Sequence, residues 1–329
     1  MVFNYGTFDD SDPNFYLKFT RGIMIYALSA YPFSDFLMEY QVQRRGIIEQ
    51  TLQLNCADKT RLFNALQVNN TDSNRFYNYY FHTDNCTTRA RDMIVKNIQS
   101  PVLFKNIFSG TPPTFRQLIH TYLDKNHQYW SKLGIDICLG SNLDKKVTTE
   151  EAMFLPDYLM KGFDNAFINN QPLVYQKQTV LEMPLREHSS SLFRPSKIFV
   201  ALFAIIVALA LLNKRWSHKT LRVFDGLLFL FIGLAGLLMT FLWIIRVDTV
   251  CRNNFNLLWA WPTHIAFAFV LYKKKNWIRK YFWGVIIINS LLFLTWYFLP
   301  QQLNVSLIPV VLIIIFRSWQ LLRQNSHSA

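Results

Sequence analysis

Charged residues are scarce in this 329-residue sequence: Asp, Glu, Lys and Arg make up only 17% of it, against about a quarter in an average soluble domain. The shortage is uneven. Residues 1–195 mix polar and apolar side chains freely, whereas long apolar runs dominate residues 196–322. This contrast excludes a uniformly soluble chain. It predicts two domains, 1–190 and 191–329, with their boundary near Ser189–Ser191.

Cysteine is also rare, and none of the four cysteines lies in a CxxC pair. The spacing therefore gives no indication of a zinc knuckle, and we expect neither a metal nor a cofactor. Cys56 with Cys138 is the only disulfide pairing that we consider. The favoured alternative is that both are buried free thiols, which behave as small apolar side chains.

Acidic residues number only 21 against 34 basic ones, which gives a net charge of +13. Such an excess can indicate nucleic-acid binding. Here many of the Lys and Arg residues cluster in short loops between apolar runs, where membrane topology accounts for them. We therefore expect no nucleic-acid partner.

The C-terminal half contains five apolar segments near the length that a membrane-spanning helix needs, which is about 20 residues. They predict an all-α bundle of about five helices. The last segment contains Pro309, which makes it the weakest candidate. The predicted spans are 197–212, 223–245, 256–271, 281–299 and 303–319.

Basic loops predict how this bundle is oriented, because cytoplasmic loops near membrane ends are rich in Lys and Arg. Four basic residues follow the first span and five follow the third, so both loops are expected in the cytoplasm. The N-terminal domain then lies outside, which predicts a multi-pass inner-membrane protein with a periplasmic domain. These basic residues are Lys214, Arg215, Lys219, Arg222, Lys273, Lys274, Lys275, Arg279 and Lys280.

The loop before the third span is unusually polar for its position. Polar residues that enter a membrane helix usually face a functional cavity, so this loop predicts a site for a lipid headgroup. The alternative is a structural loop whose tryptophans belong to the aromatic belt. The candidate binding residues are Arg252, Asn253, Asn254, Asn256 and His264.

The N-terminal domain shows an α+β pattern. Apolar and polar residues alternate in 47–54, and aromatic residues fill 75–81, so both segments are predicted strands. Residues 2–5 are expected to form the end of a further strand. Residues 58–68 place Leu62, Phe63 and Leu66 at helical spacing.

Cys86 follows the aromatic strand at the start of a predicted helix. Asp84 or Asn85 is a suitable N-cap, and apolar residues from Ala90 onward mark one helix face. A thiol in a first helical turn lies near unpaired N–H groups and the positive end of the helix dipole, which favours the reactive thiolate. Arg89 is expected to stabilise an anion there. The alternative is a buried structural cysteine with a surface arginine.

A nucleophilic cysteine needs a base, usually histidine. His82 is close in sequence, but a strand residue so near Cys86 can point elsewhere. His120 lies in a capped helix, where a surface position is the simpler expectation. No pairing of a histidine with a partner residue stands out in the sequence.

Several segments together resemble the Lnb-type lipoprotein N-acyltransferase family, and they span most of residues 1–160. The resemblance is carried by Phe3-Asn-Tyr-Gly-Thr-Phe-Asp9, Pro13-Asn-Phe-Tyr-Leu-Lys-Phe19 with Arg21-Gly22, Asp84-Asn-Cys-Thr-Thr-Arg89, Thr114-Phe-Arg-Gln-Leu-Ile-His120, Gly134-Ile-Asp-Ile-Cys-Leu-Gly140 and Phe154-Leu-Pro-Asp-Tyr-Leu159. The helical C-terminal half fits the same family.

The resemblance implies a periplasmic, papain-like domain of the permuted lecithin:retinol-acyltransferase type. It also implies that a fatty acyl group moves from phospholipid, through a Cys86 thioester, to the α-amino group of a diacylglyceryl-cysteine lipoprotein. Backbone N–H groups of Cys86 and Thr87 are expected to form the oxyanion hole. Two other functions stay open: a papain-like peptidase or amidase of the envelope, and an inactive membrane assembly factor.

One departure from the family concerns the base. Family members carry a strand with a Gly-His pair upstream of the Asn-Tyr-Gly segment, whereas this sequence begins at Met1-Val2-Phe3 and shows no signal peptide. We therefore expect a truncated sequence or a misassigned start, with His82 or His120 as substitute bases. A diverged member that has lost catalysis is the alternative.

Overall fold

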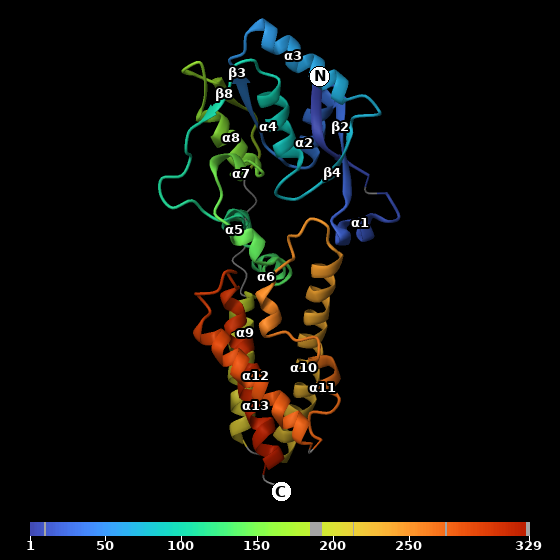
Figure 1. Ribbon diagram of the computed structural model, residues 1–329, viewed down its shortest axis with the longest axis vertical. Coiled ribbons are helices and arrows are strands. Elements are labelled where there is room, and N and C mark those ends of the chain that lie inside the picture. Colours follow the sequence, from blue (N-terminus) through green and yellow to red (C-terminus); the bar gives the residue numbers. More distant parts are fainter. Residues whose placement is uncertain (10, 185–192, 213, 274, 327–329) are drawn as a thin grey trace. The chain divides into compact units, whose positions relative to one another are not determined.

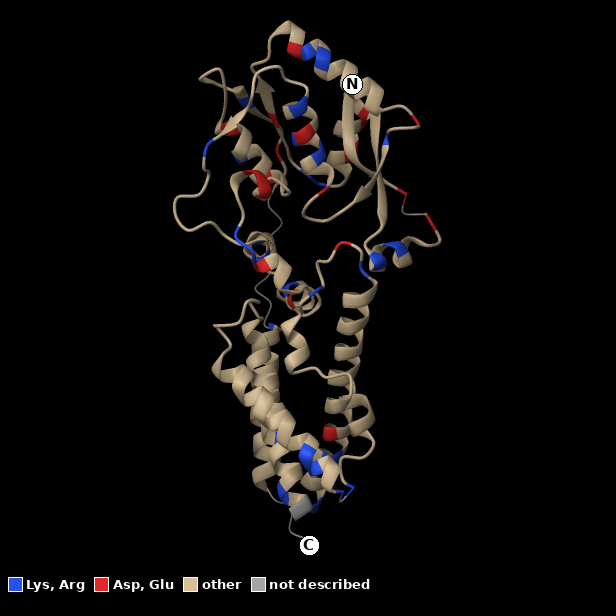
Figure 2. Cartoon of the chain, in the orientation of Figure 1, with Lys and Arg blue, Asp and Glu red and all other residues tan. Residues whose placement is uncertain are grey.

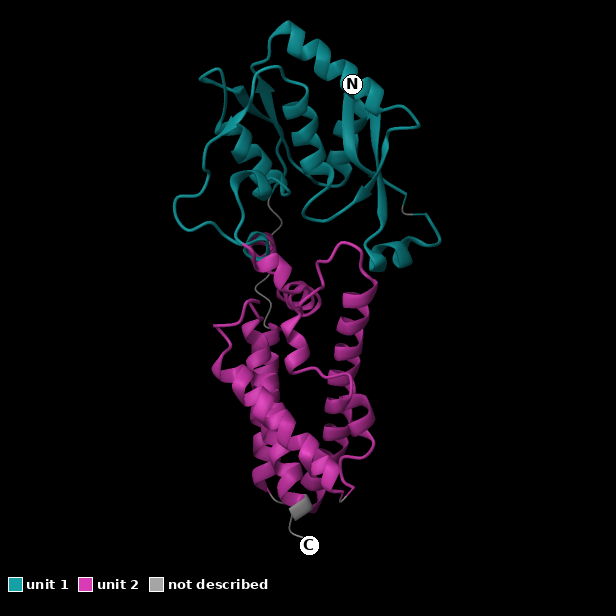
Figure 3. Ribbon diagram, viewed as in Figure 1, with its two compact units in different colours: residues 1–118, 146–187 teal, residues 119–145, 188–329 magenta. Residues whose placement is uncertain are grey.

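The computed structural model describes residues 1–9, 11–184, 193–212, 214–273 and 275–326. The chain forms two compact units (Figure 3), and each is described by itself. Unit 1 comprises Met1–Leu118 and Lys146–Glu187, and unit 2 comprises Ile119–Lys145 and His188–Ala329. Residues 119–145 thus group with the apolar half, so the two units are not separated at a single point in the sequence. The boundary expected at Ser189–Ser191 lies outside the described residues.

The main sheet of unit 1 is antiparallel, in the order β1-β2-β4. Its strands are β1 (Val2–Phe8), β2 (Met24–Tyr31) and β4 (Phe76–Tyr79), which confirms the strands expected at 2–5 and 75–81. Tyr26 pairs with Tyr77 across the sheet, and Met24 pairs with Tyr79. Because side chains of paired residues share a face, one face of this sheet is aromatic.

The other elements of unit 1 include the helix that begins at Cys86. The strands β3 and β8 pair, and β5, β6 and β7 form a third small sheet. The bounds are α1 (Phe15–Arg21), α2 (Phe33–Val42), β3 (Ile47–Leu52), α3 (Cys56–Asn69), α4 (Cys86–Lys96), β5 (Leu103–Phe104), α7 (Thr149–Ala152), α8 (Pro156–Asp164), β6 (Ala166–Ile168), β7 (Gln171–Pro172) and β8 (Val174–Leu181).

Helix α4 packs on the aromatic face of the main sheet. Tyr5, Leu28 and Tyr77 form the buried cluster there, and Ala90 and Met93 of α4 pack against it. The apolar stripe seen in the sequence therefore faces the sheet, as the spacing of Ala90 and Met93 predicted. This packing fixes the start of α4, and with it Cys86, against the aromatic side chains.

Unit 2 contains four helices that are long and apolar enough to cross a membrane, among the described residues. They are α9 (Pro195–Leu212), α10 (Arg215–Ile245), α12 (Asn276–Leu294) and α13 (Ile308–Ser326), the last preceded by the 3₁₀ turn η3 (Val305–Leu307) (Figure 1). Pro309 lies in the first turn of α13, where its missing N–H removes no helical hydrogen bond. The remaining elements are α5 (Phe115–Lys125, shared by both units), α6 (Tyr129–Cys138) and the 3₁₀ turn η1 (Ser141–Asp144).

The span expected at 256–271 is not one long helix. It contains the 3₁₀ turn η2 (Phe255–Leu258) and the five-residue helix α11 (His264–Ala268). This segment runs antiparallel along α10 at very close range. A Cβ on Gly236 would lie 2.0 Å from the Ala260 carbonyl oxygen, and one on Gly233 would lie 2.6 Å from the Ile265 nitrogen. Only glycine permits this approach.

Candidate functional site

Cys86 is the first residue of α4, and Asn85 is its N-cap. The Asn85 side chain accepts hydrogen bonds from the N–H groups of Thr87 (3.0 Å) and Thr88 (2.9 Å). It also donates to the carbonyls of Phe81 (3.0 Å) and Phe154 (2.8 Å). Four hydrogen bonds on one buried side chain anchor the helix start firmly, so the position of Cys86 is well defined.

The half-buried Cys86 thiol lies beside one backbone donor that is still available. The Cys86 N–H makes no hydrogen bond within the described part of the chain. The Thr87 N–H, which we expected in the oxyanion hole, is taken by Asn85. The capping box therefore leaves one N–H group of the expected pair, that of Cys86.

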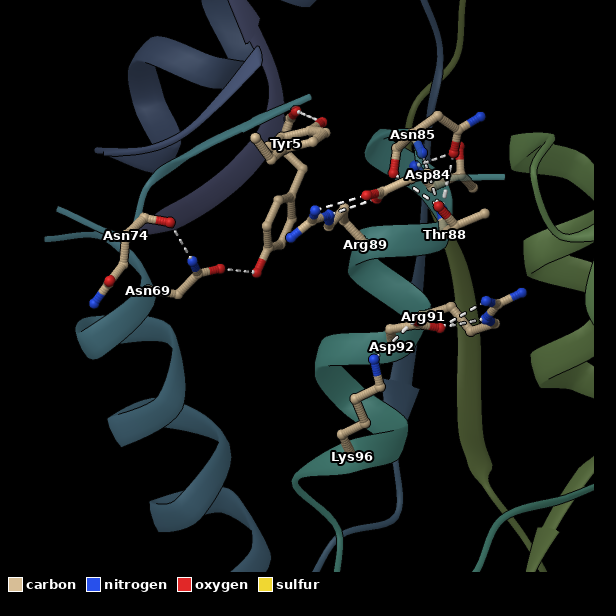
Figure 4. A network of polar contacts seen from close by, with 12 residues as sticks. Tyr5, Asn69, Asn74, Asp84, Asn85, Thr88, Arg89, Arg91, Asp92 and Lys96 are labelled. Carbon is tan, nitrogen blue, oxygen red and sulfur yellow. Dashed lines mark hydrogen bonds and ion pairs between the residues drawn. The ribbon is translucent and has the colours of Figure 1, made fainter. Parts of the chain in front are cut away.

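Arg89 is engaged away from the thiol. Its guanidinium forms a bidentate pair with Asp84, at 2.5 and 2.7 Å (Figure 4). The hydrogen bonds that Arg89 donates to Asp84 raise the pKa of Arg89 above its usual range. The guanidinium carbon also lies 4.6 Å from the centroid of the Tyr77 ring. Asp84 thus neutralises the positive charge of Arg89, which the sequence analysis expected to stabilise the Cys86 thiolate.

A row of aromatic rings leads from helix α1 toward Cys86. Ring centroids are 6.0 Å apart for Phe15 and Phe8, 4.9 Å for Phe8 and Tyr26, and 4.2 Å for Tyr26 and Tyr79. Burial raises the pKa of both tyrosines, and the nearby charge of Cys86 raises it further. Both phenols therefore stay protonated beside the thiol.

An open pocket of about 580 Å³ follows the outer part of this row, lined by Phe8, Phe15 and Tyr26 among others. Beside it, helix α1 has no buried residue. Tyr16 is 81% exposed and Phe19 58% exposed. Apolar surface of this extent is unusual on a soluble domain and marks a binding or membrane-contacting surface.

The four cysteines are all free thiols, so the disulfide considered between Cys56 and Cys138 is not formed. The expectation of buried thiols is wrong for Cys56, which is exposed, while Cys138 is half-buried and Cys251 is buried. Burial raises the pKa of Cys138, and it raises that of Cys251 to about 12. Both thiols therefore resist ionisation.

The candidate base His82 lies in the turn between β4 and α4. Its ring packs edge-on against Phe115, with centroids 4.9 Å apart. Within the described residues, Cys86 has one side-chain hydrogen-bond contact, to the Thr87 hydroxyl at 3.8 Å. Among the described residues of unit 1, Cys86 therefore makes no direct pair with a histidine.

His120 belongs to unit 2, where the expectation of a surface position is wrong: it is only 7% exposed. Its Nε2 lies 2.8 Å from Oδ1 of the buried Asp136, and Asn304 donates to the other carboxylate oxygen at 2.8 Å. These residues border a pocket of about 230 Å³ that Lys132 also lines. A histidine oriented by a carboxylate suits proton transfer.

Sequence reasoning missed this trio because Asn304 lies 168 positions after Asp136. No local spacing links the two residues. The only available signal was a polar residue in each of two apolar segments, since a buried polar group needs a partner.

The loop before the third expected span is largely structural. Asn254 and Asn256 are buried and donate to the carbonyls of Ile137 (2.7 Å) and Asp136 (2.8 Å). His264 is fully buried, with Nδ1 2.7 Å from the Tyr281 hydroxyl. Of the five candidate headgroup ligands, only Arg252 and Asn253 are exposed.

The described residues contain no group of three or more His, Cys, Asp or Glu side chains that could hold a metal ion. Residues 1–121 match the Lnb N-terminal periplasmic domain, and residues 187–328 match the Lnb transmembrane domain. Searches of curated proteins and of solved structures return no significant match.

Proposed function

The chain belongs to the Lnb family, as a membrane protein with a periplasmic N-terminal domain and a multi-span region, and from this premise we propose that it is a lipoprotein N-acyltransferase of the inner membrane. Cys86 is the nucleophile, a phospholipid is the acyl donor, and a lipoprotein with a free α-amino group is the acceptor. A permuted papain-like fold for unit 1 is part of the same proposal.

One observation carries the proposal: Cys86 is next to an aromatic row that continues to exposed apolar surface. A peptidase or amidase acts on a polar, water-borne chain and has no use for such a row. A fatty acyl chain gains about 0.8 kcal/mol for each buried CH₂ group. The row therefore favours a lipid donor, whose ester carbonyl would lie at the thiol.

The chemistry proceeds in two balanced steps. The Cys86 thiolate attacks the ester carbonyl of the donor, a thioester forms, and the lysophospholipid alkoxide leaves after taking up a proton. The acceptor amine then attacks the thioester, the C–N bond of an amide forms as the C–S bond breaks, the Cys86 thiolate leaves, and the base takes up the amine proton. Dividing one difficult acyl transfer in this way makes each step easier.

Residues around Cys86 support both steps. The free Cys86 N–H is placed to stabilise the tetrahedral oxyanion, because donors near a developing charge lower the barrier. The Asn85 cap and the Arg89–Asp84 pair hold the helix start in place. His82 and His120 are the candidate proton acceptors. Arg252 and Asn253, the exposed residues of the polar loop, are the candidate headgroup contacts.

The test uses a host that lacks its own lipoprotein N-acylation. We expect the full chain to add a fatty acyl mass to the N-terminus of a reporter lipoprotein, and Cys86→Ala to abolish the addition. Cys56→Ala is the matched control, because Cys56 also begins a helix but lies outside the aromatic row. Full activity of Cys86→Ala would refute the proposal.

A trapped adduct separates the remaining alternatives. With the donor lipid supplied and no acceptor present, Cys86 should carry a fatty acyl group by peptide mass spectrometry. A peptide or muropeptide adduct would assign a peptidase or amidase instead. No adduct, together with unchanged lipoprotein levels and maturation in Cys86→Ala, would assign a non-enzymatic role.

The proton acceptor is tested in the same assay. His82→Asn and His120→Asn are compared for acyl transfer between pH 6 and 9. Replacing the true base should lower the rate by on the order of 10²-fold or more and remove the rise in rate that accompanies its deprotonation. A replacement that lowers the rate equally at every pH identifies a structural residue.

A further inference from the structure

At one end of unit 2 there is a basic pocket that the acyl-transfer chemistry does not use. It has a volume of about 980 Å³ and lies between the start of α10, Tyr272 and the end of α13. The N-terminal domain is periplasmic, so α9 runs inward and the α9–α10 turn lies on the cytoplasmic side. Lys and Arg gather at this end of the unit (Figure 2).

Arg317, which lines the pocket, belongs to a buried ion pair. Arg317 is 1% exposed and binds Asp225 through two hydrogen bonds of 2.7 and 2.8 Å. The Tyr272 hydroxyl donates to the same carboxylate at 2.5 Å. Asp225 is therefore fully engaged by Arg317 and Tyr272, and it leaves no negative charge available for the other cations of the pocket.

Three further cations line the pocket without a carboxylate partner in the described part of the chain: Arg215, Lys219 and Arg222. They lie at i, i+4 and i+7 on one face of α10. Like charges three or four residues apart on a helix repel one another and destabilise it. The arrangement costs stability unless an anion occupies the pocket.

We propose that this pocket binds the phosphate of an anionic phospholipid in the cytoplasmic leaflet. Arginine forks match phosphate oxygens in pairs, and Arg222 is held over the Tyr272 ring at 4.4 Å. Trp216 also lines the pocket and is 54% exposed, which suits a residue at the headgroup level. Basic pockets between membrane helices on this side recognise such lipids.

A basic end alone does not require a pocket, because Lys and Arg anywhere near the cytoplasmic surface satisfy the orientation rule. The matched control is therefore Lys275→Gln/Arg279→Gln/Lys280→Gln, which removes three exposed cations from the start of α12, outside the pocket. The test variant is Arg215→Gln/Lys219→Gln/Arg222→Gln. Both remove the same charge from the same side.

The full chain is purified in a zwitterionic detergent and titrated with dioleoylphosphatidylglycerol or dioleoylphosphatidylcholine, and bound lipid is counted by native mass spectrometry. Each Lys or Arg near an anionic lipid contributes about a factor of five. We expect the test variant to bind phosphatidylglycerol roughly 100-fold more weakly, and the control variant to stay within about threefold of the parent. Phosphatidylcholine binding should not separate the variants.

Equal losses in both variants, or no loss in either, would overturn the proposal. Inorganic phosphate and glycerol 3-phosphate are titrated in parallel, and if either binds as tightly as phosphatidylglycerol, the ligand is a soluble anion and the lipid assignment is wrong. If the test variant does not fold, Arg215→Lys/Arg222→Lys keeps every charge but loses the paired donors. It should still weaken lipid binding several-fold, and unchanged binding would refute the arginine contacts.

Discussion

Cys56 and Cys86 occupy the same position in two different helices, which makes them a natural comparison. Each is the first residue of its helix and follows an Asn N-cap. The first turn of α3 already contains the carboxylate of Asp58, whereas α4 has no acidic residue in its first turn. An anion at a helix N-terminus weakens the field that favours a thiolate. The helix position alone is therefore not what distinguishes Cys86.

The first prediction follows from this comparison. Iodoacetamide near neutral pH should alkylate Cys86 faster than Cys56, although Cys56 is more exposed. Cys138 and Cys251 should react slowest, because burial raises the pKa of both thiols. Peptide mass spectrometry at timed intervals gives the four rates.

Denatured protein is the control, and there the four rates should converge. If Cys56 reacts as fast as Cys86 in the native protein, the Asp58 carboxylate does not slow the reaction of Cys56. The case for a special environment at Cys86 is then lost.

Tyr5 predicts how unit 1 responds to alkaline pH. Burial raises its pKa from 10.0 to about 12, partly offset by the charge of Arg89. A raised pKa means that the folded state holds the proton more tightly than the unfolded state. This contribution to stability is complete below pH 10 and is lost as pH rises toward 12.

The measurement is the midpoint of thermal unfolding of the full chain at pH 8 to 11.5. Tyr5→Phe removes the ionisable group and the 2.6 Å hydrogen bond from its hydroxyl to Asn69. The variant should be less stable at pH 8 but should show a smaller decline above pH 10. An identical decline in both proteins would assign the effect to other groups.

The residues predicted to bind a headgroup divide into exposed and buried ones, and substitutions should separate the two groups. Arg252→Ala and Asn253→Ala should leave expression unchanged and lower acyl transfer, if these exposed residues contact a headgroup. Asn256→Ala should instead lower yield and unfolding temperature, because it leaves the Asp136 carbonyl and Trp259 Nε1 without their partner. A lost buried hydrogen bond costs about 1–3 kcal/mol.

The assays are reporter acylation and thermal unfolding, carried out on the same preparations. If Arg252→Ala and Asn253→Ala both acylate the reporter at the parent rate, the loop is a membrane anchor only. If Asn256→Ala unfolds at the same temperature as the parent, the buried hydrogen bonds of Asn256 contribute little to stability.

At the scale of elements, the N-cap of α4 does more than begin a helix. Asn85 closes the capping box and also holds the carbonyls of Phe81 and Phe154. Within the described part of the chain, the side chain of Asn55, the exposed cap of α3, makes hydrogen bonds only to Asp58. Asn85→Ala should therefore cost about 2–3 kcal/mol and Asn55→Ala about 1 kcal/mol, since a cap alone is worth about 1.

Unfolding by guanidinium, followed by fluorescence, gives both values on the full chain. Asn85→Asp keeps the cap but loses the two amide donors, so it should fall between the parent and Asn85→Ala. Equal costs for Asn85→Ala and Asn55→Ala would show that the contacts to Phe81 and Phe154 contribute little.

Local features of these elements were predictable from the sequence. The strands at 2–5 and 75–81, the helix with Cys86 in its first turn, and a cap at Asp84 or Asn85 follow from alternation, helical spacing and capping preference, and the structure selects Asn85. The pairing of Arg89 was not predictable, because Asp84 competes with the thiolate for the same guanidinium and only the geometry decides between them. The pairing of His120 with Asp136 was not predictable either, because neither helix by itself shows which side chain of the other helix it contacts.

The segment 256–271 shows a different limit of sequence reasoning. Its apolar content predicted a spanning helix, but Pro262 and the polar residues around it interrupt the helical hydrogen bonds. The close approach of Gly233 and Gly236 allows this irregular backbone to pack against α10. Irregular backbone at membrane depth is tolerated only where protein buries it.

At the scale of the whole molecule, this segment decides the topology. As the chain advances from Ala260 to Tyr272, its contacts on α10 move backward, from Gly236 to Asp225. It therefore runs antiparallel to α10 over most of the helix. If the segment crosses the membrane, the number of spans is odd, and we predict that the C-terminus lies on the side opposite to the periplasmic N-terminal domain.

Without a crossing at 256–271, the four long helices would return the C-terminus to the periplasm and place the basic start of α12 outside, against the orientation rule.

We expect instead that a cysteine at Asn253 reacts with an impermeant maleimide in whole cells, in a background without the native cysteines, while one at Lys275 reacts only after lysis. A fusion at the C-terminus should fluoresce as green fluorescent protein and be inactive as alkaline phosphatase. Labelling of both positions from outside, with an active phosphatase, would mean that the segment folds back instead of crossing.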